Sequence, residues 1–205
     1  MIITFYNPAA IKAQVGDKSL VFGPGDRNTY RSKPSRFSAD IFFTSLNDSF
    51  SAIKREDLLE DQSLIEGPGE YELSGVFIKA FTSSGPKELI NTIYVVDFEG
   101  IRLGYLGALA NIDISNEVAE EIGSADIIFI PIGDQGTLSP AQAAKLTTNI
   151  QPKIVVPIFF DDKGNNLDLF KKEIGGDGGE VMDKLSIKRK DLEGKESEVV
   201  ILSAV

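Results

Sequence analysis

Residues 125–160 read ADIIFIPIGDQGTLSPAQAAKLTTNIQPKIVVPIFF. Within this stretch, Ile127–Pro131 and Lys153–Phe160 are short apolar runs, which is typical of strands buried on both faces. Between them, the capping box Ser139–Gln142 (SPAQ) begins a helix that we expect to run through about Thr148. The stretch therefore predicts a strand–helix–strand unit with parallel-type strands.

The chain before this unit is expected to be mostly strands joined by tight turns. Gly16-Asp17 and Glu99-Gly100 separate apolar or alternating runs, as hairpin turns do. Ala39–Thr44 (ADIFFT) is expected to be a buried strand, and Tyr71–Phe81 one alternating strand. A short helix is expected around Ser51–Leu59. Further strands are expected at Ile2–Tyr6, Ile11–Val15, Leu20–Phe22, Leu64–Glu66, Thr92–Asp97 and Ile101–Leu106.

The C-terminal part adds helices and a last pair of strands. Ile114–Ile122 and Asn166–Ile174 are expected to be helices, the second closed by Gly175. Leu185–Lys190 and Val199–Leu202 predict a β-hairpin within residues 183–205. No linker divides the sequence, so we expect a single mixed α/β domain over residues 1–205.

The composition excludes much of enzyme chemistry. The 205 residues include no cysteine and no histidine. Disulfides, iron–sulfur clusters, thiol nucleophiles and imidazole bases are therefore excluded. Zinc sites draw mainly on thiolate and imidazole ligands, so a metal centre here would have to use carboxylates, which suit magnesium or calcium better.

The charge of the chain disfavours two classes of partner. The formal net charge is −10, which repels phosphate groups of nucleic acids and anionic membrane surfaces. No apolar run reaches the ~20 residues that a membrane span needs. The first residues lack a charged segment followed by a long apolar segment, so no signal peptide is expected and a cytoplasmic location is the default.

Two charged segments are candidate binding sites. Asp161 and Asp162 follow a buried strand, where ligand sites often lie, but the following residues lack the spacing of a calcium loop. A turn that leads into a helix explains these acids without a metal. A basic cluster with interleaved aromatic residues is better explained as a solvated loop than as an anion site; its members are Arg27, Arg31, Lys33 and Arg36, with Tyr30 and Phe37.

Taken in order, several segments resemble the metallo-β-lactamase fold superfamily, and within it the small stand-alone, lactonase-like metal-dependent hydrolases. The best match is Gly67–Glu72 (GPGEYE) followed by Gly75–Ile78 (GVFI). Residues 91–103, Ala125–Gly133 and Gln151–Pro157 (QPKIVVP) then fit in order, so the resemblance covers about residues 1–160. It implies a four-layer αββα sandwich, with two mixed sheets between outer helices.

The same resemblance implies that the metal ligands of the superfamily are lost. Its hallmark T-H-x-H-x-D-H follows a buried strand, where this chain has residues 44–50 (TSLNDSF). Another histidine of the superfamily falls near residues 82–84, and an early Gly-His pair falls at Asn7-Pro8. The remaining ligand positions, including the bridging aspartate and the last histidine, give a vestigial cleft of Ser45, Asn47, Ser49, Phe50, Ala108 and Phe159.

Three hypotheses follow from this replacement. The first is a non-catalytic protein, with no cofactor, that binds an unknown protein or small molecule in the remodelled cleft, where Phe50 and Phe159 would place apolar bulk. The second is a hydrolase with substituted chemistry, in which Asp48, Asp161 or Asp162 acts with a hard cation or as a metal-free base. The third is a structural subunit of an oligomer, suggested by 13 phenylalanines.

Overall fold

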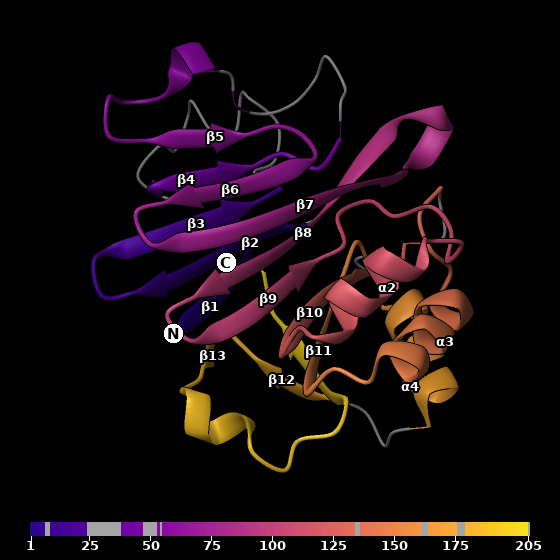
Figure 1. The fold of residues 1–205 in the computed structure, drawn as a ribbon. Helices are drawn as coiled ribbons and strands as arrows, with labels where there is room; N and C mark the ends of the chain where they lie inside the picture. Colours follow the sequence, from indigo (N-terminus) through magenta and orange to yellow (C-terminus); the bar gives the residue numbers. More distant parts are fainter. Residues whose placement is uncertain are drawn as a thin grey trace.

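The structure is a computed structural model that describes residues 1–6, 9–23, 38–46, 53, 55–133, 136–160, 164–175 and 179–204. Two mixed β-sheets pack face to face, and helices cover part of the second sheet (Figure 1). This arrangement confirms the predicted mixed α/β sandwich. All three α-helices of the described residues lie against the second sheet; they are α2 (Asn116–Gly123), α3 (Pro140–Ile150) and α4 (Asn165–Ile174).

The first sheet has six strands in the order β13-β1-β2-β3-β4-β5. Antiparallel pairing joins β13, β1, β2 and β3, whereas β3, β4 and β5 pair in parallel. The parallel part holds the short buried strand expected from ADIFFT. The bounds are β1 (Ile2–Tyr6), β2 (Ala10–Val15), β3 (Lys18–Phe22), β4 (Ile41–Phe43), β5 (Ser63–Ile65) and β13 (Leu185–Ser186).

The second sheet has eight strands in the order β12-β14-β11-β10-β9-β8-β7-β6. Strands β6 to β9 form an antiparallel meander, and β9, β10, β11, β14 and β12 are parallel. The bounds are β6 (Gly69–Leu73), β7 (Val76–Ser84), β8 (Ile90–Phe98), β9 (Ile101–Tyr105), β10 (Ile127–Pro131), β11 (Ile154–Ile158), β12 (Glu180–Met182) and β14 (Glu198–Leu202).

Short 3-10 turns complete the described secondary structure. They are η2 (Arg55–Asp57), η3 (Pro86–Glu88) and η4 (Arg189–Leu192). The predicted helix around residues 51–59 is thus a 3-10 turn in its described part. None of the described helices is long and apolar enough to cross a membrane.

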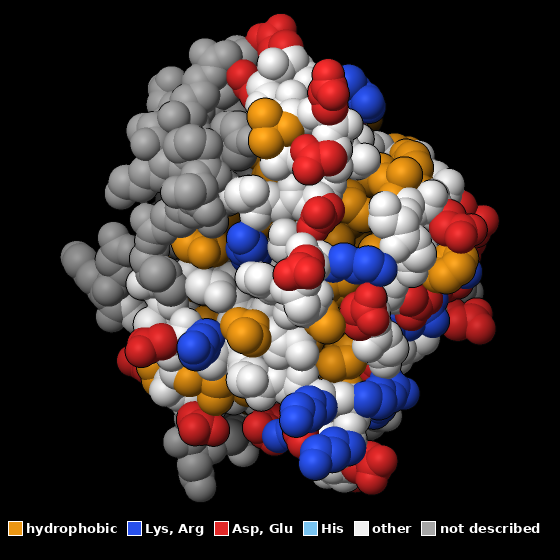
Figure 2. Space-filling model, turned by 90° about the vertical axis from the view of Figure 1, so that its left-hand side faces the viewer, with side chains coloured by type: hydrophobic (Ala, Val, Ile, Leu, Met, Phe, Trp, Pro, Cys, Tyr) orange, Lys and Arg blue, Asp and Glu red, His pale blue; other side chains and the backbone are white. Residues whose placement is uncertain are grey.

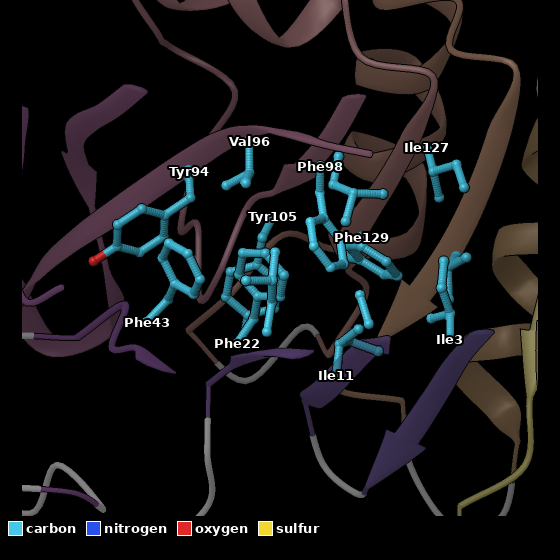
Figure 3. Packing of buried hydrophobic residues seen from close by; sticks show 14 of the residues in the cluster. Ile3, Ile11, Phe22, Phe43, Tyr94, Val96, Phe98, Tyr105, Ile127 and Phe129 are labelled. Carbon is cyan, nitrogen blue, oxygen red and sulfur yellow. The ribbon is translucent and has the colours of Figure 1, made fainter. Parts of the chain in front are cut away.

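The core lies between the two sheets and is rich in aromatic rings. Phe22 stacks on Phe43 with 4.5 Å between ring centroids and on Tyr105 with 5.2 Å (Figure 3). A second apolar cluster fills the space between the second sheet and the helices, where Ile93 and Val95 of β8 meet the helices. The two clusters explain why the central strands are apolar on both faces.

Two sequence predictions were wrong. Tyr71–Phe81 is not one strand, because Ser74 and Gly75 turn the chain with φ of 51° and 80° and make the hairpin β6–β7. Residues 183–205 do not form a hairpin, because β13 pairs with β1 in the first sheet while β14 pairs with β11 and β12 in the second. The chain after β13 instead forms η4 and crosses from one sheet to the other.

Candidate functional site

The structure describes three of the predicted cleft residues. Ser45 follows β4, Ala108 follows β9 and Phe159 directly follows β11. Each therefore lies beyond the carboxyl end of a strand, where sites of α/β proteins commonly lie. Asn47, Asp48, Ser49, Phe50, Asp161 and Asp162 lie outside the described residues, so their placement stays a prediction.

Ser45 and the residues around Ala108 are brought into close contact. Gly107 adopts a φ of 59°, and a Cβ on it would lie 2.6 Å from the Ser45 Cβ and 2.4 Å from Asn91 Oδ1. The Ser45 carbonyl accepts a hydrogen bond of 2.6 Å from the Thr92 backbone N–H. Ser45, after a strand of the first sheet, thus lies beside the Gly107-Ala108 segment of the second sheet, and their assignment to lost ligand positions stays a prediction.

Asn91 is the central residue of this junction, and no pattern in the sequence predicts its role. Its side chain is fully buried. Its Nδ2 donates to Ser83 Oγ at 2.8 Å and to the Leu106 carbonyl at 3.0 Å, while its Oδ1 accepts from the Ala108 N–H at 2.9 Å. One neutral amide therefore joins β7, β8 and the segment after β9, with its donors and acceptor in use.

Ser83 places a further lost-ligand position in the same junction. It lies within residues 82–84, where the resemblance puts another histidine, and its hydroxyl bonds to Asn91. One asparagine near the start of a strand forms no recognisable sequence motif, so the role of Asn91 could not be predicted from the sequence. Five residues together form the Asn91 junction: Ser45, Ser83, Asn91, Gly107 and Ala108.

Tyr105 borders the junction without supplying a base. Burial raises the pKa of its hydroxyl well above the ordinary value, against an opposing effect of hydrogen bonding with Ser45. The hydroxyl also donates to the Ala9 carbonyl at 3.2 Å. Tyr105 therefore stays protonated near neutral pH and acts as a buried donor.

Phe159 lies at the end of β11, two strands away from β9. Its φ of 59° is unusual for a residue with a bulky side chain, and such a conformation costs about 1–3 kcal/mol. The half-buried side chain packs against the core between the sheets. The assignment of this position to the last histidine of the superfamily stays a prediction.

These residues do not fit the dinuclear metal centre of the superfamily. The Ser45 and Ser83 hydroxyls are neutral, Ala108 offers a methyl group and Phe159 a phenyl ring, whereas such a centre needs several deprotonated donors. The amide of Asn91 is already committed to three hydrogen bonds. Among the described residues, no three histidine, cysteine, aspartate or glutamate side chains are grouped as metal ligands.

A charged cluster lies at the other end of β9. The buried carboxylate of Asp126 accepts from Lys153 Nζ at 2.7 Å, from the Arg102 N–H at 2.9 Å and from the Arg189 guanidinium. Burial raises the pKa of Asp126, but these donors outweigh it and hold the pKa below its usual value. The "Asp126 cluster" therefore ties β9, β10, β11 and η4 together through charge.

Comparison with known proteins identifies the family. A family model described as a beta-lactamase superfamily domain matches residues 2–159. The chain therefore belongs to the beta-lactamase superfamily. Its fold is similar to that of a Thermotoga maritima protein named for an inferred Zn-dependent hydrolase activity of the metallo-beta-lactamase superfamily, with a TM-score of 0.76, 23% identity and coverage of 100% and 99% of the two chains.

Other similar proteins carry related names. A metallo-hydrolase of Ignicoccus hospitalis matches with a TM-score of 0.66 and 14% identity over 91% of this chain and 99% of its own. A UPF0173 protein of Pyrococcus furiosus is 29% identical over 111 residues, which are 54% of this chain and 51% of that protein. A UPF0173 metal-dependent hydrolase of Lysinibacillus sphaericus is 53% identical over 36 residues, 18% of this chain and 16% of its own. The chain spans about half the length, or less, of the curated relatives it matches.

Proposed function

We propose that this chain is a non-catalytic member of its superfamily and acts by binding a protein or a small molecule. The observation that carries the proposal is the Asn91 junction, in which neutral and apolar side chains take the positions that the resemblance assigns to metal ligands. Homologues are named metal-dependent hydrolases. The proposal therefore means that this chain keeps the fold of its superfamily but has lost metal-dependent catalysis.

The absence of imidazole and thiolate from the whole chain supports the proposal. A metal that activates water needs ligands that hold it tightly and leave a coordination position open. Hydroxyl, methyl and phenyl groups cannot do this, and the buried tyrosine next to the junction stays protonated because of its raised pKa.

Metal loading tests the proposal directly. The purified protein is incubated with zinc, manganese or iron, dialysed, and measured by inductively coupled plasma mass spectrometry. We expect far less than one equivalent of each metal to remain. A retained stoichiometric metal that raises the melting temperature would overturn the proposal.

The second candidate function is hydrolysis with substituted chemistry. It is favoured by the position of Asp161 and Asp162, which follow the carboxyl end of β11 in the sequence. Phosphoesters, lactones and thioesters are assayed with magnesium or calcium added. Turnover that Asp161→Ala, Asp162→Ala or Asp48→Ala abolishes would establish this function and remove the first, and we expect none.

A further inference from the structure

The outer face of the second sheet is only partly covered. The helices pack over the side that holds β10 and β11, whereas a groove of about 280 Å³ opens over β6 to β9. Phe77 of β7 is 53% exposed in this groove, and Val95 is almost fully buried. An exposed aromatic ring in a hollow marks a surface that can bury apolar area against a partner.

Strand register arranges the groove side chains in two rows. In the first row, Glu72, Phe77, Asp97 and Arg102 lie opposite one another in turn across β6 to β9. In the second row, Glu70 lies opposite Lys79, which lies opposite Val95. The Phe77 ring therefore lies between two carboxylates, an arrangement that favours a cation placed over the ring.

The cations of the groove are already paired with a helix. Glu121 of α2 accepts from Arg102 at 2.6 Å and from Lys79. Arg102 also lies 3.6 Å from Asp97. Within the described residues, no ion pair engages Glu70 or Glu72. Lys79 also interacts electrostatically with Glu70. The carboxylates that line the groove (Glu70, Glu72 and Asp97) nevertheless outnumber its two cations, Lys79 and Arg102, so the groove keeps an excess of negative charge.

Strand β6 is also an edge of the sheet. It is the last strand in the order, so one side of its backbone pairs with no strand in the described part of the chain. Its sequence GEYEL carries no lysine and no proline, the residues that commonly protect edges. Figure 2 shows the side of the molecule that lies at the left in Figure 1, where acidic, basic and hydrophobic side chains are interspersed.

We propose that β6 and this groove dock an extended basic segment of a partner protein, which adds as a strand beside β6. Alternate side chains of such a segment would lie next to Glu70 and Glu72, where arginine or lysine is favoured. The intervening side chains would lie next to Tyr71 and Leu73, which pack at the margin of the core, where apolar residues are favoured. This face is separate from the Asn91 junction, so the inference goes beyond the proposed function and holds for a hydrolase as well.

The charge pattern selects among possible occupants. A second copy of the chain paired through β6 would bring Glu70 and Glu72 next to the same acids, which like-charge repulsion disfavours. An anionic surface, such as a phosphate backbone, is repelled by the same side chains. A segment that alternates basic and apolar residues satisfies both the charges and the edge.

Fluorescence anisotropy with a labelled synthetic peptide tests the proposal. The probe is a short peptide that alternates arginine with valine or threonine, and the first control replaces each arginine with glutamate. We expect the arginine peptide to bind, more weakly as salt is raised, and the glutamate peptide not to bind. A second control, N-methylated along one backbone edge so that it cannot pair as a strand, is expected to lose binding.

Protein variants locate the site. The double variant Glu70→Gln/Glu72→Gln should weaken binding roughly five- to tenfold, and Phe77→Ser about two- to fivefold. Glu180→Gln, on the opposite edge strand β12, is the matched control and should leave the affinity unchanged. All these side chains are exposed, so circular dichroism should show folded variants.

Several outcomes would overturn the proposal. The first is that the wild-type protein does not bind the arginine peptide, and the second is that it binds the glutamate or the N-methylated peptide equally well. The third is that the Glu70→Gln/Glu72→Gln variant binds the arginine peptide as tightly as the wild-type protein does. The fourth is that Glu180→Gln loses as much affinity as that double variant. Sedimentation velocity tests whether a second copy of the chain pairs with β6 instead. A wild-type dimer that dissociates in the Glu70→Gln/Glu72→Gln variant would show that it does, and would overturn the proposal. None of these results depends on whether the protein retains metal.

Discussion

The two ends of β9 are held by different chemistry. Beyond its carboxyl end, the Asn91 junction joins strands through a fully buried neutral amide. Near its start, the Asp126 cluster joins strands through a buried carboxylate and cations that are partly exposed, with 37% of Lys153 and 60% of Arg189 side-chain surface accessible. The first end depends on geometry and burial, and the second on charge.

The difference shows how a scaffold can persist without its metal ions. In a dinuclear centre, ligands from several strands are held together by the ions themselves. Here the Asn91 amide makes the connections, because one of its hydrogen bonds reaches β7 and the other two reach the segment after β9. The amide side chain of Asn91 needs no metal ion and has no ionisable group. Its contribution to the free energy of unfolding should therefore be independent of pH and salt.

The largest effect is expected from Asn91→Ala. The change removes three hydrogen bonds, two of them buried, and leaves the buried Ala108 N–H and Leu106 carbonyl without the amide, so the free energy of unfolding should fall by about 3–5 kcal/mol. Urea unfolding measures it. Ser83→Ala removes one of the bonds and should cost about 1 kcal/mol. Equal losses for the two variants would contradict the central role of Asn91.

Gly107→Ala is expected to have the next largest effect. The added Cβ would lie 2.4 Å from Asn91 Oδ1 and 2.6 Å from the Ser45 Cβ, at a φ of 59°. Gly16→Ala is a close control, because Gly16 has a φ of 58° and no atom within 4 Å of an added Cβ. Backbone strain alone should cost about 1 kcal/mol at Gly16, and crowding should raise the loss at Gly107 to about 2–4 kcal/mol. Similar losses at both positions would mean that the junction is loosely packed.

Asp126→Asn should show that the two ends of β9 differ in how their contribution to stability depends on pH. Because the folded-state pKa of Asp126 is lowered, its charge stabilises the fold above the unfolded-state pKa, and this contribution is lost as pH falls through the folded-state pKa. The variant should lose about 1–2 kcal/mol near pH 7 and progressively less in acid. Chemical unfolding across this pH range measures the difference. Asn91→Ala should show no such convergence, and a pH-independent loss for Asp126→Asn would contradict the charge-based account.

Arg189→Met should give the smallest effect. Arg189 donates to Asp126 and to the Gly100 carbonyl, but its side chain is largely exposed, so the loss should be about 0.5–1 kcal/mol. Raising the ionic strength should reduce the difference from the wild-type protein, because salt screens exposed charges. Thermal unfolding at low and high salt is the measurement. A loss that grows with salt would show that Arg189 acts through packing instead.

Local signals in the sequence predicted much of the fold. The turn at Glu99 and Gly100 has φ values of 49° and 78°, as a tight hairpin requires. The capping box at Ser139 begins α3 with both of its hydrogen bonds formed. These features are determined by neighbouring residues, which is why they can be predicted without knowledge of the tertiary structure.

The failures have non-local causes. In Tyr71–Phe81 the inward residues are Tyr71 and Leu73 before the turn and Val76 and Ile78 after it, so the two-residue turn shifts the alternation by one. The prediction of one strand over Tyr71–Phe81 therefore assumed an alternation of inward and outward side chains that holds only up to the turn. For β13 and β14 the partners are β1 and β11, which are distant in sequence, and short apolar runs do not specify partners.

The candidate site divides in the same way. Its predicted location came from the resemblance, and the structure brings Ser45 and the segment of Ala108 together in one junction. The identity of its central side chain did not follow, because Asn91 acts through contacts with two segments that are separate from its own strand, β7 and the chain after β9. Buried polar groups of this kind become visible only when all their partners are known.

The crossing of the chain between β13 and β14 has a consequence for biosynthesis. Strand β13 borders β1, and the Ala204 bridge to Phe5 brings the last described residues back to the first strand. During translation, neither sheet can be completed until residues 185–204 have left the ribosome. The nascent protein must therefore keep one side of β1 unpaired until β13 emerges, and one side of β11 unpaired until β14 emerges. The longer wait, that of β1, leaves a strand edge exposed to aggregation and to chaperone binding.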